Sequence, residues 1–362
     1  MKFFQFKSFF VVYVLLNLQT QYLVLGEPQV PCFFIFGDSL SDNGNNNNLV
    51  TLAKANYKPY GIDFPQGPTG RFSNGRNLAD FIAENLGFAS FIPPFARTKN
   101  TQGSESLQGV NYASGGAGIR RETGQAMGRV ISLDEQLRNH EYTISKIDRL
   151  LGRNESATRT YLERCLYVVE MGSNDYLNNY FSSLPYTTSL QFSPREYALA
   201  LLKQLSSQVK TLYTRGAKKV AVFGVGSLGC TPYATATYDT QGSPCVDRIN
   251  DAIQLFNVGL RSLVQDLNAN FTDAKYTFID TYQISSQGPP VSFTPCCQVK
   301  LTGAQCDPYG KVCGNRSEAV FWDGVHPTEI AFMALANRSF NAQFPNDTHP
   351  FDISQLAQLK LP

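Results

Sequence analysis

Short apolar runs alternate with helical segments along most of this 362-residue chain, and this alternation limits the folds it can adopt. The runs with the length and apolar content of buried strands are 32–36, 110–113, 165–171, 220–225 and 276–279. The segments with apolar residues at helical spacing are 78–86, 133–151, 194–215, 247–267 and 327–340. Strands that alternate with helices form mainly parallel sheets covered by helices. Without an internal repeat or a linker, the sequence predicts a single α/β domain over residues 27–362.

Polar or small residues follow the first three of these runs. Ser39, Gly116 and Asn174 each lie three residues beyond the end of a run. The carboxyl ends of parallel strands meet at one edge of the sheet, where α/β proteins bind their ligands. The three residues are therefore expected at one site, with Ser39 as a candidate nucleophile. The stretch Gly37-Asp38-Ser39-Leu40 can also be interpreted as an ordinary turn, because its Gly, Asp and Ser are turn formers.

Of the three histidines, one stands among residues suited to a reactive site. His140 lies in a polar helical stretch and His349 in the tail, so both are expected at the solvated surface. His326 lies in a loop rich in aromatic residues and glycine, three residues after Asp323. Gly324 would permit a turn that lets the carboxylate reach the imidazole of its own segment.

The Asp-x-x-His stretch has two interpretations. Pro327 is suited to the first position of the last helix, which would make His326 its N-cap. The positive end of the helix then disfavours imidazolium, and a neutral His326 could take a proton from Ser39. In the alternative, His326 only caps the helix and Asp323 accepts a backbone hydrogen bond.

Four stretches together resemble a known family. Residues 36–45, FGDSLSDNGN, are similar to the signature of the plant-type GDSL esterase/lipases of the SGNH hydrolase superfamily. Residues 111–118, 172–175 and 323–328 match later blocks of that family, so the resemblance covers nearly all of the chain beyond its first 30 residues. It implies a flavodoxin-like, three-layer α/β/α fold with a mainly parallel sheet, and no metal or cofactor.

The resemblance also implies a role for each residue of the site. Ser39 would be the nucleophile, His326 the base and Asp323 the group that orients the base. The backbone N–H groups of Ser39 and Gly116 and the side chain of Asn174 would donate hydrogen bonds to the oxyanion. All these positions hold the residue that the family requires, which argues for an active enzyme.

Four of the eight cysteines lie close together in the sequence: Cys296, Cys297, Cys306 and Cys313. A metal site is one interpretation of such a cluster. However, two adjacent cysteines cannot easily both face one ion, and no histidine lies between them. Disulfide bonds are therefore favoured over a metal centre.

The other cysteines are expected to differ among themselves. Cys230 and Cys245 flank a short loop and are the best candidates for a disulfide. Cys32 and Cys165 lie at strand positions and are expected to be free, buried thiols.

Two aspartates and an asparagine run near the site are expected to be structural. Asp38 and Asp175 are expected to bond to the loop backbone, and the asparagine run at 45–48 is expected to be a solvated loop.

The sequence of the first 26 residues predicts that the protein is exported from the cell. Lys2 and Lys7 precede an apolar segment at 9–16, and Gly26 ends a possible cleavage site, so residues 1–26 resemble a secretory signal peptide. Beyond it, no apolar run reaches the length of a membrane span. The Asn-x-Ser/Thr glycosylation candidates are Asn154, Asn270, Asn315, Asn337 and Asn346. The expected location is extracellular, in the apoplast or cell wall.

The net charge and the context of a glycine-rich motif argue against nucleic-acid binding and dinucleotide binding. A net charge of +2 without a basic run argues against a nucleic-acid partner. Residues 224–229 match the G-x-G-x-x-G pattern of dinucleotide-binding proteins, but a Cys-Thr-Pro loop follows instead of a helix. The expected protein is a secreted serine esterase or lipase that acts on a lipid, an acylated sugar or a cutin-like polymer. Two alternatives stay open: an extracellular transacylase that builds a polyester, and a wall- or glycan-binding protein without activity.

Overall fold

The computed structural model describes residues 27–182, 185–286, 294–300 and 303–361. The expected signal peptide, residues 1–26, lies outside the described residues. The described chain forms a five-stranded sheet in the order β1-β2-β3-β4-β5. The strands are β1 (Phe33–Gly37), β2 (Leu166–Glu170), β3 (Lys219–Phe223), β4 (Lys275–Ile279) and β5 (Thr348–His349). Strands β1 to β4 are parallel and β5 is antiparallel to β4, which confirms the mainly parallel sheet.

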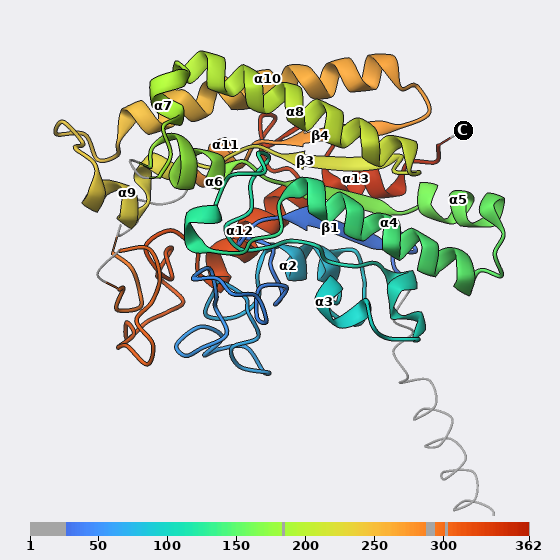
Figure 1. The fold of residues 1–362 in the computed structure, drawn as a ribbon, viewed down its shortest axis with the longest axis horizontal. Helices are drawn as coiled ribbons and strands as arrows, with labels where there is room; N and C mark the ends of the chain where they lie inside the picture. The colour runs from blue at the N-terminus through green and yellow to red at the C-terminus, as the bar shows by residue number, and fades with distance from the viewer. Residues whose placement is uncertain (1–26, 183–184, 287–293, 301–302, 362) are drawn as a thin grey trace, which may run out of the picture.

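Helices cover both faces of this sheet, so the three-layer α/β/α fold is confirmed (Figure 1). One face packs against α4 (Leu133–Leu150), α5 (Glu155–Glu163), α8 (Pro194–Thr214) and α10 (Asp247–Asn270). The other face packs against α2 (Leu78–Asn85), α11 (Thr281–Ser286), α12 (Glu329–Phe340) and α13 (Ile353–Gln358). Successive side chains of a strand point to opposite faces, so Phe34 belongs to the first core and Ile35 to the second.

Short helical turns connect these elements. They are α3 (Phe95–Thr98), η1 (Ser104–Gln108), η2 (Gln125–Met127), α6 (Ser173–Asp175), η3 (Tyr176–Tyr180), α7 (Thr188–Gln191), η4 (Leu228–Cys230) and α9 (Pro232–Thr237). The prediction of a short strand at 110–113 was wrong, because this segment forms only single bridges. It still lies along the free edge of β1, where the backbone N–H of Tyr112 donates to Ile35 O at 2.8 Å.

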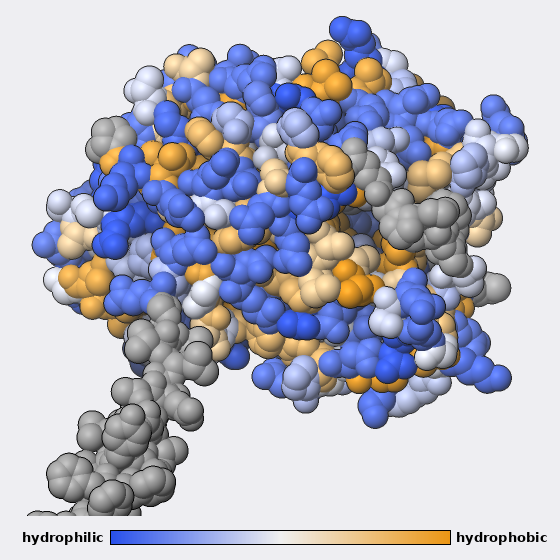
Figure 2. Space-filling model, turned by 180° about the vertical axis from the view of Figure 1, so that it is seen from behind, coloured by the Kyte–Doolittle hydropathy of each residue, from blue (hydrophilic) through white to orange (hydrophobic). Residues whose placement is uncertain are grey.

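The outer surface is mixed in character. Figure 2 shows one face, on which hydrophilic residues predominate and apolar residues gather in smaller groups between them. In the described part of the chain, no helix has both the length and the apolar character needed to cross a membrane.

Four disulfide bonds join the eight cysteines. They are Cys32–Cys165, Cys230–Cys245, Cys296–Cys313 and Cys297–Cys306. The structure thus contains the pair favoured from the sequence, Cys230–Cys245. The expectation that Cys32 and Cys165 are free thiols was wrong. Each precedes one of two adjacent parallel strands, and this brings their Cα atoms to 4.8 Å.

His140 is buried, and the expectation that it lies at the solvated surface was wrong. Its side chain is fully buried and packs against the rings of Phe34, Phe36 and Tyr167. Its Nδ1 lies 3.0 Å from the hydroxyl of Tyr112. Burial lowers the pKa of His140 to about 3, so the folded protein holds it neutral. His349 is partly exposed and belongs to β5.

The buried His140 predicts a specific loss of stability in acid. Its folded pKa of about 3 lies below the unfolded value of 6.5, so the unfolded state binds the extra proton as the pH falls between these values. The free energy of unfolding then decreases by up to about 1.4 kcal/mol per pH unit from this residue alone. In His140→Phe, the difference in free energy of unfolding between pH 7 and pH 4 should shrink accordingly in urea titrations. An unchanged difference would contradict this account of His140.

Candidate active site

Ser39 lies at the carboxyl edge of the sheet, two residues after the end of β1. Its side chain is mostly buried. The preceding residue, Asp38, is buried and accepts a hydrogen bond from the backbone N–H of Leu40 at 3.0 Å. This short turn fixes the Ser39 backbone and directs its hydroxyl toward the loop that carries His326.

Three side chains of the predicted site form a continuous chain of contacts. The Oγ atom of Ser39 lies 2.8 Å from Nε2 of His326. On the other side of the ring, Nδ1 of His326 lies 2.8 Å from Oδ2 of Asp323 and 2.9 Å from Oδ1. An ionised carboxylate only accepts hydrogen bonds, so Nδ1 carries the proton and Nε2 is free to accept one from Ser39.

The carboxylate of Asp323 reaches the imidazole of its own segment and also accepts backbone hydrogen bonds, so it makes the contacts of both interpretations. Oδ1 of Asp323 accepts from the backbone N–H groups of Val325 and His326 at 2.9 and 2.7 Å. Gly324 is required by close approach, because a Cβ atom there would collide with the backbone oxygen of Gly303.

His326 is not the N-cap of the following helix, so that prediction was wrong. Helix α12 begins at Glu329 and its N-cap is Thr328. The backbone oxygen of His326 instead accepts from Trp322 N–H at 2.8 Å. The imidazole contacts Asp323 and Ser39, and the centroid of the Phe72 ring lies 4.8 Å from its own.

The side chain of Asn174 connects the Ser39 turn to the loop that carries Gly116. The amide nitrogen of Asn174 donates to Asp38 Oδ2 at 3.0 Å and to Ala117 O at 2.9 Å. These contacts connect the residue before Ser39 to the residue after Gly116, so the three predicted oxyanion donors come together. Among the described residues, the backbone N–H groups of Ser39 and Gly116 donate to no acceptor, which leaves both available to a ligand.

Both amide hydrogens of Asn174 are occupied in this structure. An oxyanion that approaches must therefore take the place of one of the two acceptors, Asp38 or Ala117. Asn178 donates to Asn174 Oδ1 at 2.6 Å and keeps the amide in this orientation.

Buried polar residues that the sequence did not single out support the Gly116 loop. Asp42 Oδ2 accepts from the backbone N–H of Gly115 at 2.9 Å, and Asn46 donates to the backbone oxygen of Gly115 at 2.8 Å. Asn45 donates to the backbone oxygens of Asn111 and Ala113. The asparagine run was expected to be a solvated loop, but Asn45 and Asn46 are buried.

Asp175 has the structural role expected for it. It accepts from the backbone N–H groups of Ile119 and Arg120 at 2.8 and 3.0 Å and from the hydroxyl of Thr123 at 2.7 Å. Burial raises the pKa of Asp175 to about 6. It therefore fixes the loop that follows Gly116.

Glu170 is a second buried acid beside the Ser39 turn. It ends β2 directly opposite Gly37 and is only 4% exposed. The backbone N–H of Asp38 and the hydroxyl of Ser41 both approach its Oε2 at 3.5 Å. In the described chain, no lysine or arginine forms a salt bridge with it. Burial and the nearby Asp38 raise the pKa of Glu170 well above its usual range, so we expect it to be neutral.

Replacing Asn174 tests the oxyanion-donor role. Loss of one donor in such a site costs on the order of 100-fold or more in kcat. We expect this decrease for Asn174→Ala, with KM little changed and with the circular dichroism spectrum of the folded protein retained. Asn48→Ala, which truncates an exposed asparagine of the loop that follows β1, is the control. A kcat for Asn174→Ala equal to that of the control would contradict the role.

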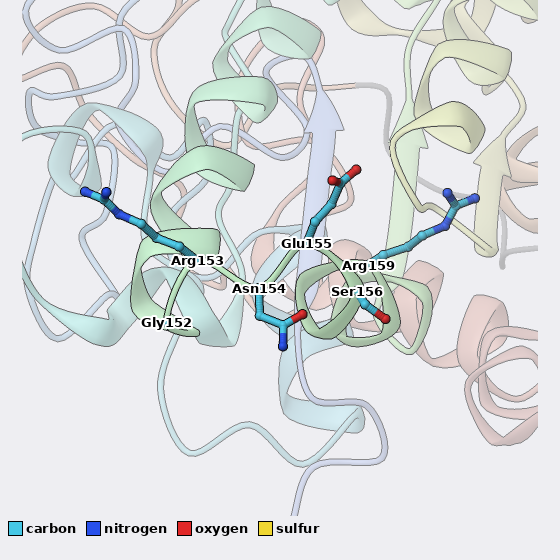
Figure 3. Close-up of a pocket in the computed structure, with 6 residues that line it drawn as sticks. All are labelled: Gly152, Arg153, Asn154, Glu155, Ser156 and Arg159. Carbon is cyan, nitrogen blue, oxygen red and sulfur yellow. The ribbon is translucent and has the colours of Figure 1, made fainter.

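A separate hollow lies at the opposite edge of the sheet. Figure 3 shows it between α4 and α5, lined by Gly152, Arg153, Asn154, Glu155, Ser156 and Arg159. Helix α5 leads directly into the amino end of β2, so this hollow is distant from the Ser39 edge. Its interest lies in Asn154, a glycosylation candidate with an exposed side chain.

Comparisons with known proteins identify the family of this chain. The family model of the GDSL-like lipases/acylhydrolases matches residues 33–338. A GDSL esterase/lipase of Arabidopsis thaliana is 49% identical over 92% of this chain and 93% of its own length. A second one is 48% identical over 96% of this chain and 97% of its own length. A solved α/β hydrolase from the metagenome of Lake Arreo, Spain, is 13% identical, with a TM-score of 0.37 over 85% of this chain and 93% of that chain.

Residues of four separate loops or strand ends thus meet at one sheet edge, and the family match extends from β1 to α12. This chain belongs to the GDSL-like lipase/acylhydrolase family.

Proposed function

We propose that this protein is a serine esterase that hydrolyses carboxylic ester bonds through an acyl intermediate on Ser39. The observation that carries the proposal is the contact chain from Asp323 through His326 to Ser39, with 2.8 Å on each side of the imidazole. The relatives named GDSL esterase/lipase support the same chemistry. The substrate class is an ester of a lipid, an acylated sugar or a cutin-like polymer.

The first half of the reaction transfers the acyl group to the enzyme. Nε2 of His326 takes the hydroxyl proton while Oγ of Ser39 attacks the ester carbonyl carbon. The oxyanion is held by the backbone N–H groups of Ser39 and Gly116 and by the Asn174 amide. The imidazolium, stabilised by Asp323, then gives its proton to the departing oxygen, which leaves as the alcohol.

The second half releases the acid. Water attacks the acyl carbon while His326 takes one of its protons, and the same donors hold the second oxyanion. Collapse of this intermediate returns the proton to Ser39 Oγ and frees the carboxylic acid. An alcohol in place of water would give a new ester, so the transacylase alternative uses the same acyl-enzyme.

Product analysis separates these functions. We expect the purified protein to convert p-nitrophenyl esters to nitrophenol and free acid, and Ser39→Ala to be inactive. Addition of a primary alcohol should leave the acid as the main product. A new ester as main product would instead assign a transacylase. If the folded protein leaves short-chain, long-chain and sugar-linked esters intact, the proposed esterase activity is refuted. That result would instead support the alternative of a wall- or glycan-binding protein without activity.

Secretion and glycosylation belong to the same proposal. Disulfide bonds at all eight cysteines suit an oxidising compartment. The sequon asparagines with exposed side chains outside helix interiors are Asn154, Asn270, Asn315 and Asn346. Asn337 lies within α12, and the hydroxyl of its partner Ser339 is buried, so it is the least accessible acceptor. Peptide mapping of the secreted protein after enzymatic deglycosylation tests each position.

A further inference from the structure

We propose that Tyr60 is a positioning residue for Asp323, held in place by the Cys297–Cys306 disulfide loop. The inference rests on the proposed esterase function and extends it to a residue outside the matched sequence blocks. Through Tyr60, an extracellular disulfide would support the catalytic carboxylate.

The hydroxyl of Tyr60 contacts Asp323 directly. Its Oη donates to Asp323 Oδ2 at 2.6 Å, and the tyrosine side chain is fully buried. Burial and the charge of Asp323 raise the pKa of Tyr60 well above its usual range, so the hydroxyl remains a donor throughout the working pH range. Hydrogen bonds to an ionised group are shorter and stronger than hydrogen bonds between neutral groups.

Tyr60 completes the set of donors around the carboxylate. Oδ1 of Asp323 accepts from two backbone N–H groups and also lies 2.9 Å from Nδ1 of His326. Among the described residues, Oδ2 contacts only the Tyr60 hydroxyl and the His326 ring. Without the hydroxyl, Oδ2 would keep a single partner. The carboxylate would then be less firmly oriented. Its negative charge, compensated by fewer donors, would attract the imidazolium form of His326 more strongly.

The disulfide loop holds the other side of the Tyr60 hydroxyl. The backbone N–H of Cys306 donates to Tyr60 Oη at 3.2 Å. Because that oxygen accepts from Cys306, its own hydrogen is directed to Asp323. Cys306 is joined to Cys297, whose N–H donates to the backbone oxygen of Trp322, next to Asp323, at 2.8 Å.

Further backbone contacts bind this loop to the catalytic segment. Cys296 N–H donates to Phe321 O at 3.0 Å, and Gly324 N–H donates to Ala304 O at 3.0 Å. On the other side, the Tyr57 hydroxyl donates to Cys306 O at 3.0 Å. The described part of the disulfide loop thus lies between the segment that carries Asp323 and the segment that carries Tyr60.

A matched pair of variants tests the role of Tyr60. Tyr60→Phe and Tyr57→Phe each remove one hydroxyl that bonds to Cys306, but only Tyr60 touches Asp323. Since a hydrogen bond to a charged group is lost, we expect Tyr60→Phe to lower kcat by about 10-fold or more with KM little changed. The acid limb of its pH–kcat profile should move to higher pH. Tyr57→Phe should retain the kcat and pH profile of the unmodified protein.

The disulfide arm uses a double-mutant cycle. The variant Cys297→Ser/Cys306→Ser should lower kcat, and adding Tyr60→Phe to it should cause little further loss, because the loop no longer holds the hydroxyl. Independent, additive losses would overturn the link to the disulfide. Equal losses in Tyr60→Phe and Tyr57→Phe, or an unshifted pH profile in Tyr60→Phe, would overturn the positioning role. Both results presuppose an active unmodified protein; its inactivity on all esters would refute the proposed function itself.

Discussion

His326→Ala is expected to lower kcat for ester hydrolysis by roughly 10⁵-fold or more, because the site then has no base to take the Ser39 proton. Within the described residues, Nε2 of His326, at 2.8 Å, is the one basic group in hydrogen-bond contact with Ser39 Oγ. Asp38, the nearest alternative in sequence, is directed instead at Leu40 and Asn174. The effect should fall on kcat, since the imidazole acts on the reacting atoms.

The chain offers a matched control for this variant. His349→Ala removes a partly exposed imidazole on β5, the strand at the opposite side of the sheet from β1. This imidazole contacts Arg261 and Gln265 of α10. It should retain the activity of the unmodified protein. An active His326→Ala, with kcat within tenfold of this control, would contradict the assignment of the base.

Asp323→Asn is expected to lower kcat by about 10⁴-fold. The carboxylate accepts from the backbone N–H groups of Val325 and His326, from the Tyr60 hydroxyl and from Nδ1 of His326. An amide has one oxygen for these donors, and its NH₂ group would face another donor. The imidazole would then favour the tautomer with its proton on Nε2, which cannot accept from Ser39.

Steady-state kinetics distinguish this mechanism from a binding defect. We expect kcat to fall far more than KM rises, because Asp323 acts through His326 and not on the bound ester. Asp239→Asn, at an exposed position, is the control. A raised KM with an unchanged kcat would show that Asp323 shapes the substrate site and does not orient the base.

The sequence revealed the parts of this protein that have regular spacing. The apolar runs that became β1 to β4 and the spacing of Asp323 and His326 were apparent without the structure. Three other elements, α5, α13 and the two-residue β5, were not predicted. The order of strands was also hidden, so the pairing of Cys32 with Cys165 across β1 and β2 was missed.

The supporting residues of the site were hidden for a different reason. Asp42, Asn46 and Tyr60 act through hydrogen bonds to residues distant in the sequence, and no local pattern marks such partners. His140 was misplaced because its polar neighbours in sequence occupy other faces of α4, while its own side chain points into the aromatic core. Glu170 was overlooked within an apolar run that otherwise predicts a buried strand correctly.

The most direct test of the central claim is to treat the folded, purified protein with a fluorophosphonate and map the adduct by mass spectrometry. The reagent requires an activated serine hydroxyl but no knowledge of the natural ester. We expect one adduct, on the peptide that carries Ser39, and its loss in His326→Ala under the same conditions. A folded protein that forms no adduct, or one modified at another serine, would contradict the proposal that Ser39 is the nucleophile of an esterase.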